Sequence, residues 1–198
     1  MNKKIFLVTN RKLAGDNFYH VLEQAVAGGV GAIILREKDL STEKLLPIAE
    51  KIKEIIGKKD VKLIINSNLE VARAVEADGL HLTFRDFISN GIKWNKTMGV
   101  SVHSVKEAVL AQKGGADYLL CGHVFQTDCK KGVEPRGVSY LEEILKKVDI
   151  PVIPIGGIDT NTALEIINLP ICGIAVMSLL MSSQNPKKHI QDLKLLVK

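Results

Sequence analysis

The sequence predicts an α/β protein folded as a closed (β/α)8 TIM barrel. Short apolar runs alternate with segments of helical periodicity along the 198 residues. The runs are continuously apolar, as is typical of parallel strands that are covered on both faces. There are eight of them, which is the strand number of this barrel, although the chain lies at the short end of the usual size range.

The predicted strands cover residues 5–9, 32–35, 62–66, 79–82, 98–102, 118–121, 152–155 and 173–176. The alternative architecture is an open doubly wound sheet, but no Gly-x-Gly-x-x-Gly turn follows the first run. No low-complexity segment, linker or break in composition divides the chain. We therefore expect one barrel domain over residues 1–198.

The segments between the strands carry signals for helix starts and ends. Ser104 and Glu107 have the spacing of a capping box, and polar starts also occur at residues 41–44 and 159–162. Glycine pairs at 28–29 and 114–115 follow alanine-rich stretches, where a left-handed C-cap favours glycine. Residues 86–94 are too irregular for a full helix.

The composition, with 46% hydrophobic and 25% charged residues, is that of a soluble globular protein. Because aromatic residues are few, we expect no base-stacking surface and no nucleic-acid partner. No apolar run is long enough to cross a bilayer, and residues 1–9 fit a first strand better than a signal peptide. The net charge of +5 has two interpretations. It reflects solvated lysines on the surface, or it attracts an anionic substrate.

Three cysteines, Cys121, Cys129 and Cys172, are odd in number and lack the spacing of metal ligands. Neither a disulfide framework nor a zinc site is indicated, and a reduced, cytoplasmic setting fits. Association into a homo-oligomer stays open, since small barrels with apolar outer helices often dimerise.

Chemically useful residues follow the predicted strands, so a barrel gathers them at its C-terminal rim. Gly156 and Gly157 follow the seventh strand, and Met177 and Ser178 follow the eighth. Glycine lets the backbone approach a phosphate closely, and barrel phosphate sites commonly use these two loops. The alternative explanation is a tight turn that needs glycine for its positive φ.

Arg36 and Lys38 follow the second strand, with Glu37 between them. Because side chains alternate along a strand, both cations point the same way and can clamp a carboxylate or a phosphate. Alternatively, they form surface ion pairs, Arg36 with Asp39 or Lys38 with Glu37.

His123 is the best candidate for acid–base chemistry. Imidazole titrates near neutrality, and His123 enters a loop directly after the sixth strand, together with Cys129 and Lys130. His81 and His103 fit hydrogen-bonding roles in the core or at the rim better. An inert role suits Cys129 better than that of a nucleophile.

Five segments, spread between residues 35 and 158, resemble the thiamine-phosphate synthase/TenI superfamily of small barrels, and the resemblance extends over nearly the whole chain. They are residues 35–40 (LREKDL), 63–66 (LIIN), 77–82 (ADGLHL), 99–104 (GVSVHS) and 155–158 (IGGI). In the sixth loop, residues 122–125 (GHVF), 127–132 (TDCKKG) and 136–139 (RGVS) look like a TenI-type thiazole tautomerase. The resemblance implies a barrel enzyme of thiamine biosynthesis.

As a tautomerase, the protein would aromatise a thiazole phosphate carboxylate tautomer by a proton shift, with no cofactor. The resemblance implies that His123 is both acid and base, as one histidine can be if it reaches both carbons. The phosphate would be bound by Gly156, Gly157, Met177 and Ser178. Developing negative charge would be stabilised by Arg36 and Lys38, and a lid over the substrate would be shaped by Thr127 and Lys130.

Departures from the synthase pattern point the same way. Synthases that resemble this chain carry a glutamine at the position of Ile34, a magnesium-binding aspartate at the position of Ser67 and an aliphatic residue at the position of His123. Asp86, however, matches their second magnesium-binding aspartate. The alternative function is therefore a thiamine-phosphate synthase, which couples hydroxymethylpyrimidine pyrophosphate to a thiazole phosphate with Mg2+.

In that alternative, pyrophosphate and metal would be held by Arg36, Asn66, Asp86, Ser101 and Lys130. A third alternative is a non-catalytic regulatory barrel that has kept only the phosphate site.

Overall fold

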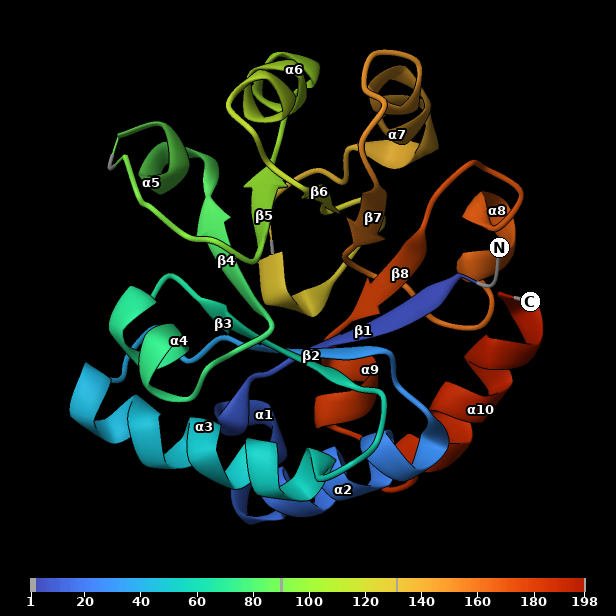
Figure 1. Cartoon of the computed structure of the whole chain (residues 1–198). Coiled ribbons are helices and arrows are strands. Elements are labelled where there is room, and N and C mark those ends of the chain that lie inside the picture. Colours follow the sequence, from blue (N-terminus) through green and yellow to red (C-terminus); the bar gives the residue numbers. More distant parts are fainter. Residues whose placement is uncertain (1–2, 90, 131, 198) are drawn as a thin grey trace.

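The computed structural model describes residues 3–89, 91–130 and 132–197. Its strands form one closed parallel barrel in chain order (Figure 1). They are β1 (Lys4–Val8), β2 (Ala32–Leu35), β3 (Lys62–Asn66), β4 (Gly79–Thr83), β5 (Thr97–Val102), β6 (Tyr118–Gly122), β7 (Val152–Ile155) and β8 (Gly173–Val176). The (β/α)8 fold is confirmed, and each predicted strand lies within one residue of the observed bounds.

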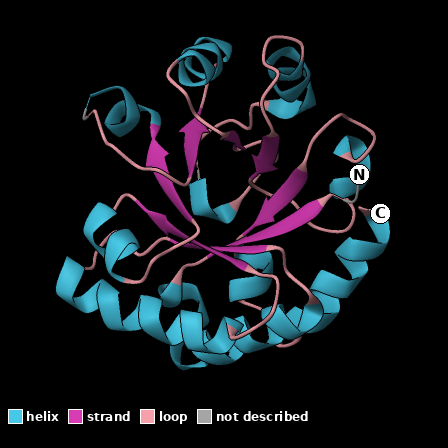
Figure 2. Ribbon diagram, viewed as in Figure 1, coloured by secondary structure: helices cyan, strands magenta, loops and turns pink. Residues whose placement is uncertain are grey.

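Helices surround the barrel on its outside (Figure 2). They are α1 (Arg11–Ala14), α2 (Phe18–Gly28), α3 (Thr42–Ile56), α4 (Leu69–Ala74), α5 (Phe84–Ser89), α6 (Val105–Lys113), α7 (Gly137–Leu145), α8 (Ala163–Ile166), α9 (Ser178–Met181) and α10 (Pro186–Leu196), with 3-10 turns η1 (Gly15–Asn17) and η2 (Asp128–Lys130). The irregular segment 86–94 contributes only the last part of the short α5. None of the described helices is long and apolar enough to cross a membrane.

Local sequence signals set the ends of these helices. At the start of α6, the Ser104 Oγ accepts a hydrogen bond from the Glu107 N–H at 3.1 Å. The Glu107 carboxylate accepts one from the His103 N–H at 2.6 Å, one residue earlier than a standard capping box requires. Gly29 ends α2 in the left-handed region, with φ 87°.

The apolar core has two layers, one inside the barrel and one between the barrel and its helices. The interior layer includes Val8, Ile34, Ile64, Leu120 and Ile153, one or two from each of several strands. The outer layer consists of side chains from the intervening strand positions and from the buried faces of the helices. Because strand side chains alternate, the next interior-facing position after Ile34 lies just past the end of β2, at the rim.

One large ring fills the interior between β5 and β6. Tyr118 is 5% exposed, and its register partner is Gly99. A Cβ atom at position 99 would collide with the Tyr118 ring. The glycine therefore makes room inside the barrel for an aromatic residue that carries a hydroxyl.

Candidate active site

The C-terminal ends of the strands hold the predicted site residues at one rim. Arg36 comes two residues after the interior residue Ile34, and its N–H donates to the Thr9 Oγ1 at 2.9 Å. Asn66 ends β3 beside His81, and Ser101 lies opposite Thr83 near the end of β5. Alternation along the strands thus carries the interior polar positions of neighbouring strands to the same end of the barrel.

Arg36, Lys38, Lys130 and Arg136 form a cation cluster, in which the charges of the other three act on Lys130. Burial lowers the pKa of Arg36. The charge of Arg36 is the main cause that lowers the pKa of Lys38. The pKa of Lys130 is lowered by burial and then by the charges of Arg136, Arg36 and Lys38. Such repulsion between cations is relieved when an anion binds among them.

The two surface ion pairs considered for the second loop do not form. Asp39 instead pairs with Arg11 at 2.6 Å and with Lys12 at 3.1 Å. Glu37 is 7% exposed, and its carboxylate accepts hydrogen bonds from the Thr9 hydroxyl at 2.7 Å and the Arg11 N–H at 3.0 Å. Both acids therefore tie the loop after β2 to the start of α1, although the charge of Glu37 also raises the pKa of Arg36 against the effect of burial.

Asp86 brings a carboxylate to the edge of the cation cluster. It lies in α5, and its Oδ2 accepts a hydrogen bond from the Thr83 hydroxyl at 2.7 Å. Its charge opposes the lowering of the Lys38 pKa by Arg36 and by burial, so the two charges lie within electrostatic range of each other. In the part of the chain that the structure describes, no three His, Cys, Asp or Glu residues are grouped as ligands for a metal ion.

The loop after β3 carries an amide and a hydroxyl where a second carboxylate was considered. The Asn66 side-chain amide donates to the Ser67 hydroxyl at 3.1 Å. Ser67 adopts a positive φ of 57°, and its N–H donates to the His81 carbonyl at 2.8 Å. This backbone contact links the end of β3, which Asn66 closes, to β4, the strand that precedes Asp86.

A chain of three side chains runs from the barrel interior to the rim. The His81 ring is 1% exposed, with Nδ1 lying 3.0 Å from the Tyr118 hydroxyl and Nε2 lying 2.7 Å from the Ser101 hydroxyl. Burial, with a smaller effect of Arg36, lowers the pKa of His81 to about 3. His81 is thus a buried, neutral ring next to a rim hydroxyl, as its position in the fourth strand suggested.

His123 is also buried, at 4% exposure, but its ring has one hydrogen-bond partner fewer than that of His81. Its Nε2–H donates to the Val133 carbonyl at 3.2 Å, across the loop that follows β6. The Nδ1 atom has no hydrogen-bond partner among the described residues. The backbone of His123 accepts from the Arg136 N–H at 3.0 Å, so both ends of the loop meet at this residue.

Two glycines let the loop after β7 lie directly against the loop after β6. Gly156 has φ 102°, and a Cβ there would meet the His123 Cβ and approach its Cα to 2.7 Å. Gly157 has φ 65°, and a Cβ there would meet the Gln126 carbonyl and approach the Phe125 Cβ to 2.8 Å. Positive φ and close approach both require glycine here. The tight turn is therefore real, and it leaves the proposed phosphate contact to backbone groups.

The remaining candidates lie at the margin of this arrangement. Met177 packs its side chain against the interior layer of the barrel, and Ser178 begins α9. Thr127 accepts a hydrogen bond from the Cys129 N–H at 3.4 Å, within the loop that carries Lys130. Cys129 is exposed, whereas burial raises the pKa of Cys121 to about 12, which makes its thiol inert.

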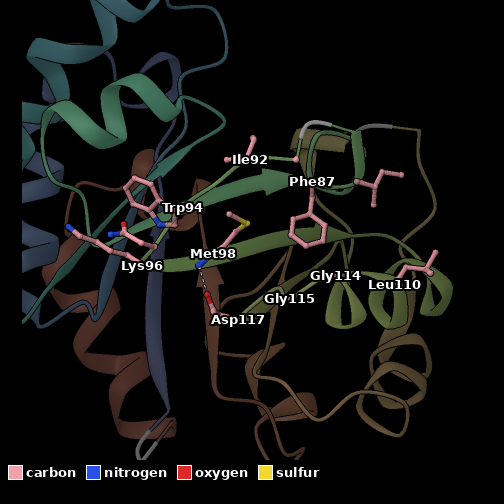
Figure 3. A pocket seen from close by; sticks show the side chains of 12 residues that line it. Phe87, Ile92, Trp94, Lys96, Met98, Leu110, Gly114, Gly115 and Asp117 are labelled. Carbon is pink, nitrogen blue, oxygen red and sulfur yellow. Dashed lines mark hydrogen bonds between the residues drawn. The ribbon is translucent and has the colours of Figure 1, made fainter.

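A cavity of about 680 Å³ lies away from the rim, between α5, α6 and residues 91–98 (Figure 3). Its lining includes Phe87, Trp94, Met98 and Asp117, and the last two lie at the starts of β5 and β6. The Asp117 carboxylate accepts from the Met98 N–H at 2.7 Å, and the Trp94 indole N–H donates to a backbone carbonyl. These two polar groups have hydrogen-bond partners within the protein, and the cavity lies at the end of the strands opposite to the cation cluster.

Sequence reasoning did not single out Tyr118 or Arg136 as members of the site. Arg136 lies over the Tyr140 ring at 5.5 Å and reaches the cation cluster from the start of α7. Tyr118 looks like an ordinary apolar strand residue until its strand is aligned with Gly99. A glycine on one strand that faces an aromatic residue on the next was the signal available.

The family model described as thiamine monophosphate synthase matches residues 5–180. The chain is 38% identical over 194 residues to the thiamine-phosphate synthase of Clostridium tetani, covering 96% of this chain and 93% of the relative. It is also 38% identical to the thiamine-phosphate synthase of Methanobrevibacter smithii, covering 98% and 94%. The solved thiamine phosphate pyrophosphorylase of Pyrococcus furiosus superposes with a TM-score of 0.88 at 33% identity, over 99% of this chain and 96% of that one.

These relatives correct the tautomerase prediction. Proteins that match nearly the full chain carry the name of the synthase, which was the alternative. The loop after β6 resembles a tautomerase, whereas the sequence as a whole matches proteins named as synthases. The role of His123 as a proton shuttle was predicted for the tautomerase reaction, so it loses the reaction that motivated it.

Proposed function

The chain belongs to the thiamine monophosphate synthase family, and we propose that it acts as a thiamine-phosphate synthase, a transferase. The substrates would be hydroxymethylpyrimidine pyrophosphate and a thiazole phosphate. A carbon–nitrogen bond forms between the pyrimidine methylene carbon and the thiazole nitrogen. The carbon–oxygen bond to pyrophosphate breaks, and pyrophosphate leaves with the bonding electrons. No proton has to move, so the reaction needs no histidine as acid or base.

The observation that carries this proposal is the cation cluster. As the carbon–oxygen bond breaks, negative charge builds on the leaving pyrophosphate. The charge of Arg36 is the main cause that lowers the pKa of Lys38, and burial followed by the charges of Arg136, Arg36 and Lys38 lowers that of Lys130. A polyanion is therefore the ligand that this cluster favours. Cations already held in place stabilise the developing charge without reorganising during the reaction.

The donor set fits Mg2+ held through a single carboxylate. Mg2+ is usually bound by one or two carboxylates together with substrate phosphates and water. Asp86 would hold it, since the Thr83 hydroxyl occupies one carboxylate oxygen and the other remains to be offered. When bound, Mg2+ would supply further neutralisation of the pyrophosphate charge.

The thiazole phosphate would occupy the other side of the rim. Gly156 and Gly157 follow β7, and Met177 and Ser178 follow β8, the two loops that barrels commonly use for phosphate. Because the Met177 side chain packs inward, its contribution would come from the backbone, whereas Ser178 can add its hydroxyl. The two substrates would then meet across the mouth of the barrel.

The direct test measures pyrophosphate release from the two substrates, with Mg2+ and with EDTA. We expect release that requires both substrates and is lost with EDTA. The variant Arg36→Ala should lose most of it while folding normally. Absence of release by the wild-type protein under conditions in which a related synthase is active would refute the proposal.

Two substitutions probe the single-carboxylate site. Asp86→Asn should raise the Mg2+ concentration for half-maximal activity about tenfold or more, because it removes the one carboxylate. Ser67→Asp should lower that concentration, because it adds a carboxylate at the end of the neighbouring strand, in a left-handed conformation that Asp tolerates. Equal Mg2+ dependence in all three proteins would show that Asp86 does not hold the ion.

A further inference from the structure

We propose that Tyr118 and His81 form a buried relay that fixes the Ser101 hydroxyl as a hydrogen-bond donor to a phosphate oxygen of the substrate. The inference rests on the proposed function only for the identity of that phosphate. The relay runs through two contacts, 3.0 Å from Tyr118 Oη to His81 Nδ1 and 2.7 Å from His81 Nε2 to Ser101 Oγ. Tyr118 and His81 act through Ser101 and are therefore positioning residues.

The first step is the protonation state of His81. The ring is 1% exposed and stacks on the Tyr118 ring, with 5.6 Å between the ring centroids. It also lies within range of the Arg36 charge. Its pKa of about 3, lowered mainly by burial, keeps it neutral at physiological pH. A neutral imidazole carries one N–H and one bare nitrogen, so it can donate to only one of its two hydroxyl partners.

The second step decides which partner receives that proton. If Nδ1 carried it, the Tyr118 oxygen would accept, and the phenol proton would need another acceptor. Among the described residues, the hydrogen bonds give the Tyr118 hydroxyl no partner but His81, and its surroundings are apolar. A buried hydroxyl proton without an acceptor is costly. The phenol therefore donates to Nδ1, and Nε2 carries the ring proton.

The third step follows at the rim. With its proton on Nε2, His81 donates to the Ser101 oxygen, and the serine's own proton is free to point elsewhere. Ser101 is only half-buried, and Arg36 is close enough to act on the same histidine. An anion held by Arg36 would thus meet a hydroxyl that can donate. If Nδ1 carried the ring proton instead, the Ser101 hydroxyl would donate its hydrogen bond to His81 Nε2 and would present only lone pairs to the anion.

Nitrogen NMR of the imidazole in the wild-type protein tests the relay in its native form. We expect the His81 Nε2 to give a protonated, pyrrole-like signal and Nδ1 a bare, pyridine-like signal, unchanged between pH 5 and 8. His81→Gln identifies the resonance. A protonated Nδ1, or a ring that titrates in this range, would overturn the proposal.

Binding of inorganic pyrophosphate, measured by calorimetry with Mg2+ present, tests the consequence at the rim. Ser101→Ala and His81→Leu should each weaken binding roughly tenfold or more, because each removes an oriented hydrogen bond to a charged group. His81→Gln keeps an amide donor near the Nε2 position and should restore most of the affinity. In His81→Leu, the further change Ser101→Ala should cost little.

Tyr118→Phe serves as the conservative probe of the far end of the relay. It keeps the ring that fills the space beside Gly99 and removes only the hydroxyl, so the barrel should fold. We expect weaker pyrophosphate binding with the same Tm within a few degrees. Unchanged affinity in Ser101→Ala would overturn the proposal. Normal pyrophosphate binding without turnover of the two substrates would instead refute the synthase assignment and leave the relay standing.

Discussion

The two sides of the barrel rim are built for anions in different ways. The loops after β2 and β6 present side-chain cations, Arg36, Lys38 and Lys130. The pKa of Lys38 is lowered mainly by the charge of Arg36, and that of Lys130 by burial and then by neighbouring cations. The loops after β7 and β8 present a backbone shaped by Gly156 and Gly157. The first side offers charge on long side chains, and the second offers fixed geometry without charge.

This difference predicts how each side responds to change. A long cation can be exchanged for another at a moderate loss, because reach and charge are partly kept. The glycine positions allow no such exchange, since any Cβ would strike the loop after β6. We therefore expect substitutions on the charged side to affect catalysis and those on the glycine side to affect folding as well.

The largest effect is expected at Arg36. Arg36→Ala should lower kcat/KM for the pyrophosphate substrate by about 10²- to 10³-fold, because it removes a preorganised charge from the leaving group. Arg36→Lys should recover part of the loss. Initial rates of pyrophosphate release measure both, and an unchanged Tm in the alanine variant is the control. A loss below threefold would place the pyrophosphate elsewhere.

The next effect concerns Gly157. Gly157→Ala should lower the free energy of unfolding by about 2–4 kcal/mol, because the new Cβ adds a collision to the unfavourable positive φ. Gly132→Ala is the matched control, since Gly132 also has positive φ but open space around it. That variant should lose only about 1 kcal/mol. Urea denaturation of both proteins measures the difference, and equal losses would remove the argument from close packing.

A smaller effect should appear in the pH dependence. The pKa of Lys130 is lowered by burial and by neighbouring cations, and that of Lys38 by Arg36 and burial. Each lysine therefore loses its charge at a lower pH than an ordinary lysine, whose pKa is about 10.4. The profile of kcat/KM for the pyrophosphate substrate should fall on an alkaline limb below that value.

The double variant Lys38→Arg/Lys130→Arg should move this limb upward, because guanidinium keeps its proton to above pH 12. The two single variants show which lysine sets the limb. A limb that stays in place in the double variant would assign it to a group outside the cation cluster.

The sequence was sufficient for the barrel because each strand is a short, almost purely apolar run, such as AIIL at residues 32–35. Position after a strand was also enough to expect Arg36 and Lys38 at the rim. The relay from Tyr118 to Ser101 could not be predicted from the sequence, because it depends on the register between β4, β5 and β6. Register sets which interior side chains touch, and no single strand carries that information.

The loop after β6 shows the converse problem. Its motif is distinctive, yet it implied a proton shuttle at His123 that the family relationships do not support. In the structure this histidine closes the loop by donating to the Val133 carbonyl, a contact across ten residues that no local pattern announces. A distinctive motif can thus reflect how a loop is held, and its chemistry has to be judged together with the rest of the rim.

The smallest expected effect separates the two sides by salt. Raising the ionic strength from about 0.05 to 0.5 M shortens the Debye length from roughly 14 to 4 Å. This screens Lys38 and Lys130, whose side chains reach solvent although each is partly desolvated by its neighbours. The KM for the pyrophosphate substrate should rise about three- to tenfold, whereas the KM for the thiazole phosphate, held by backbone groups, should change less than twofold. Lys130→Gln provides the control, because the salt dependence of the first KM should be shallower without that charge. Equal salt dependence of both KM values would mean that the two phosphates share the cation cluster, and the division of the rim into a charged and a glycine side would then be wrong.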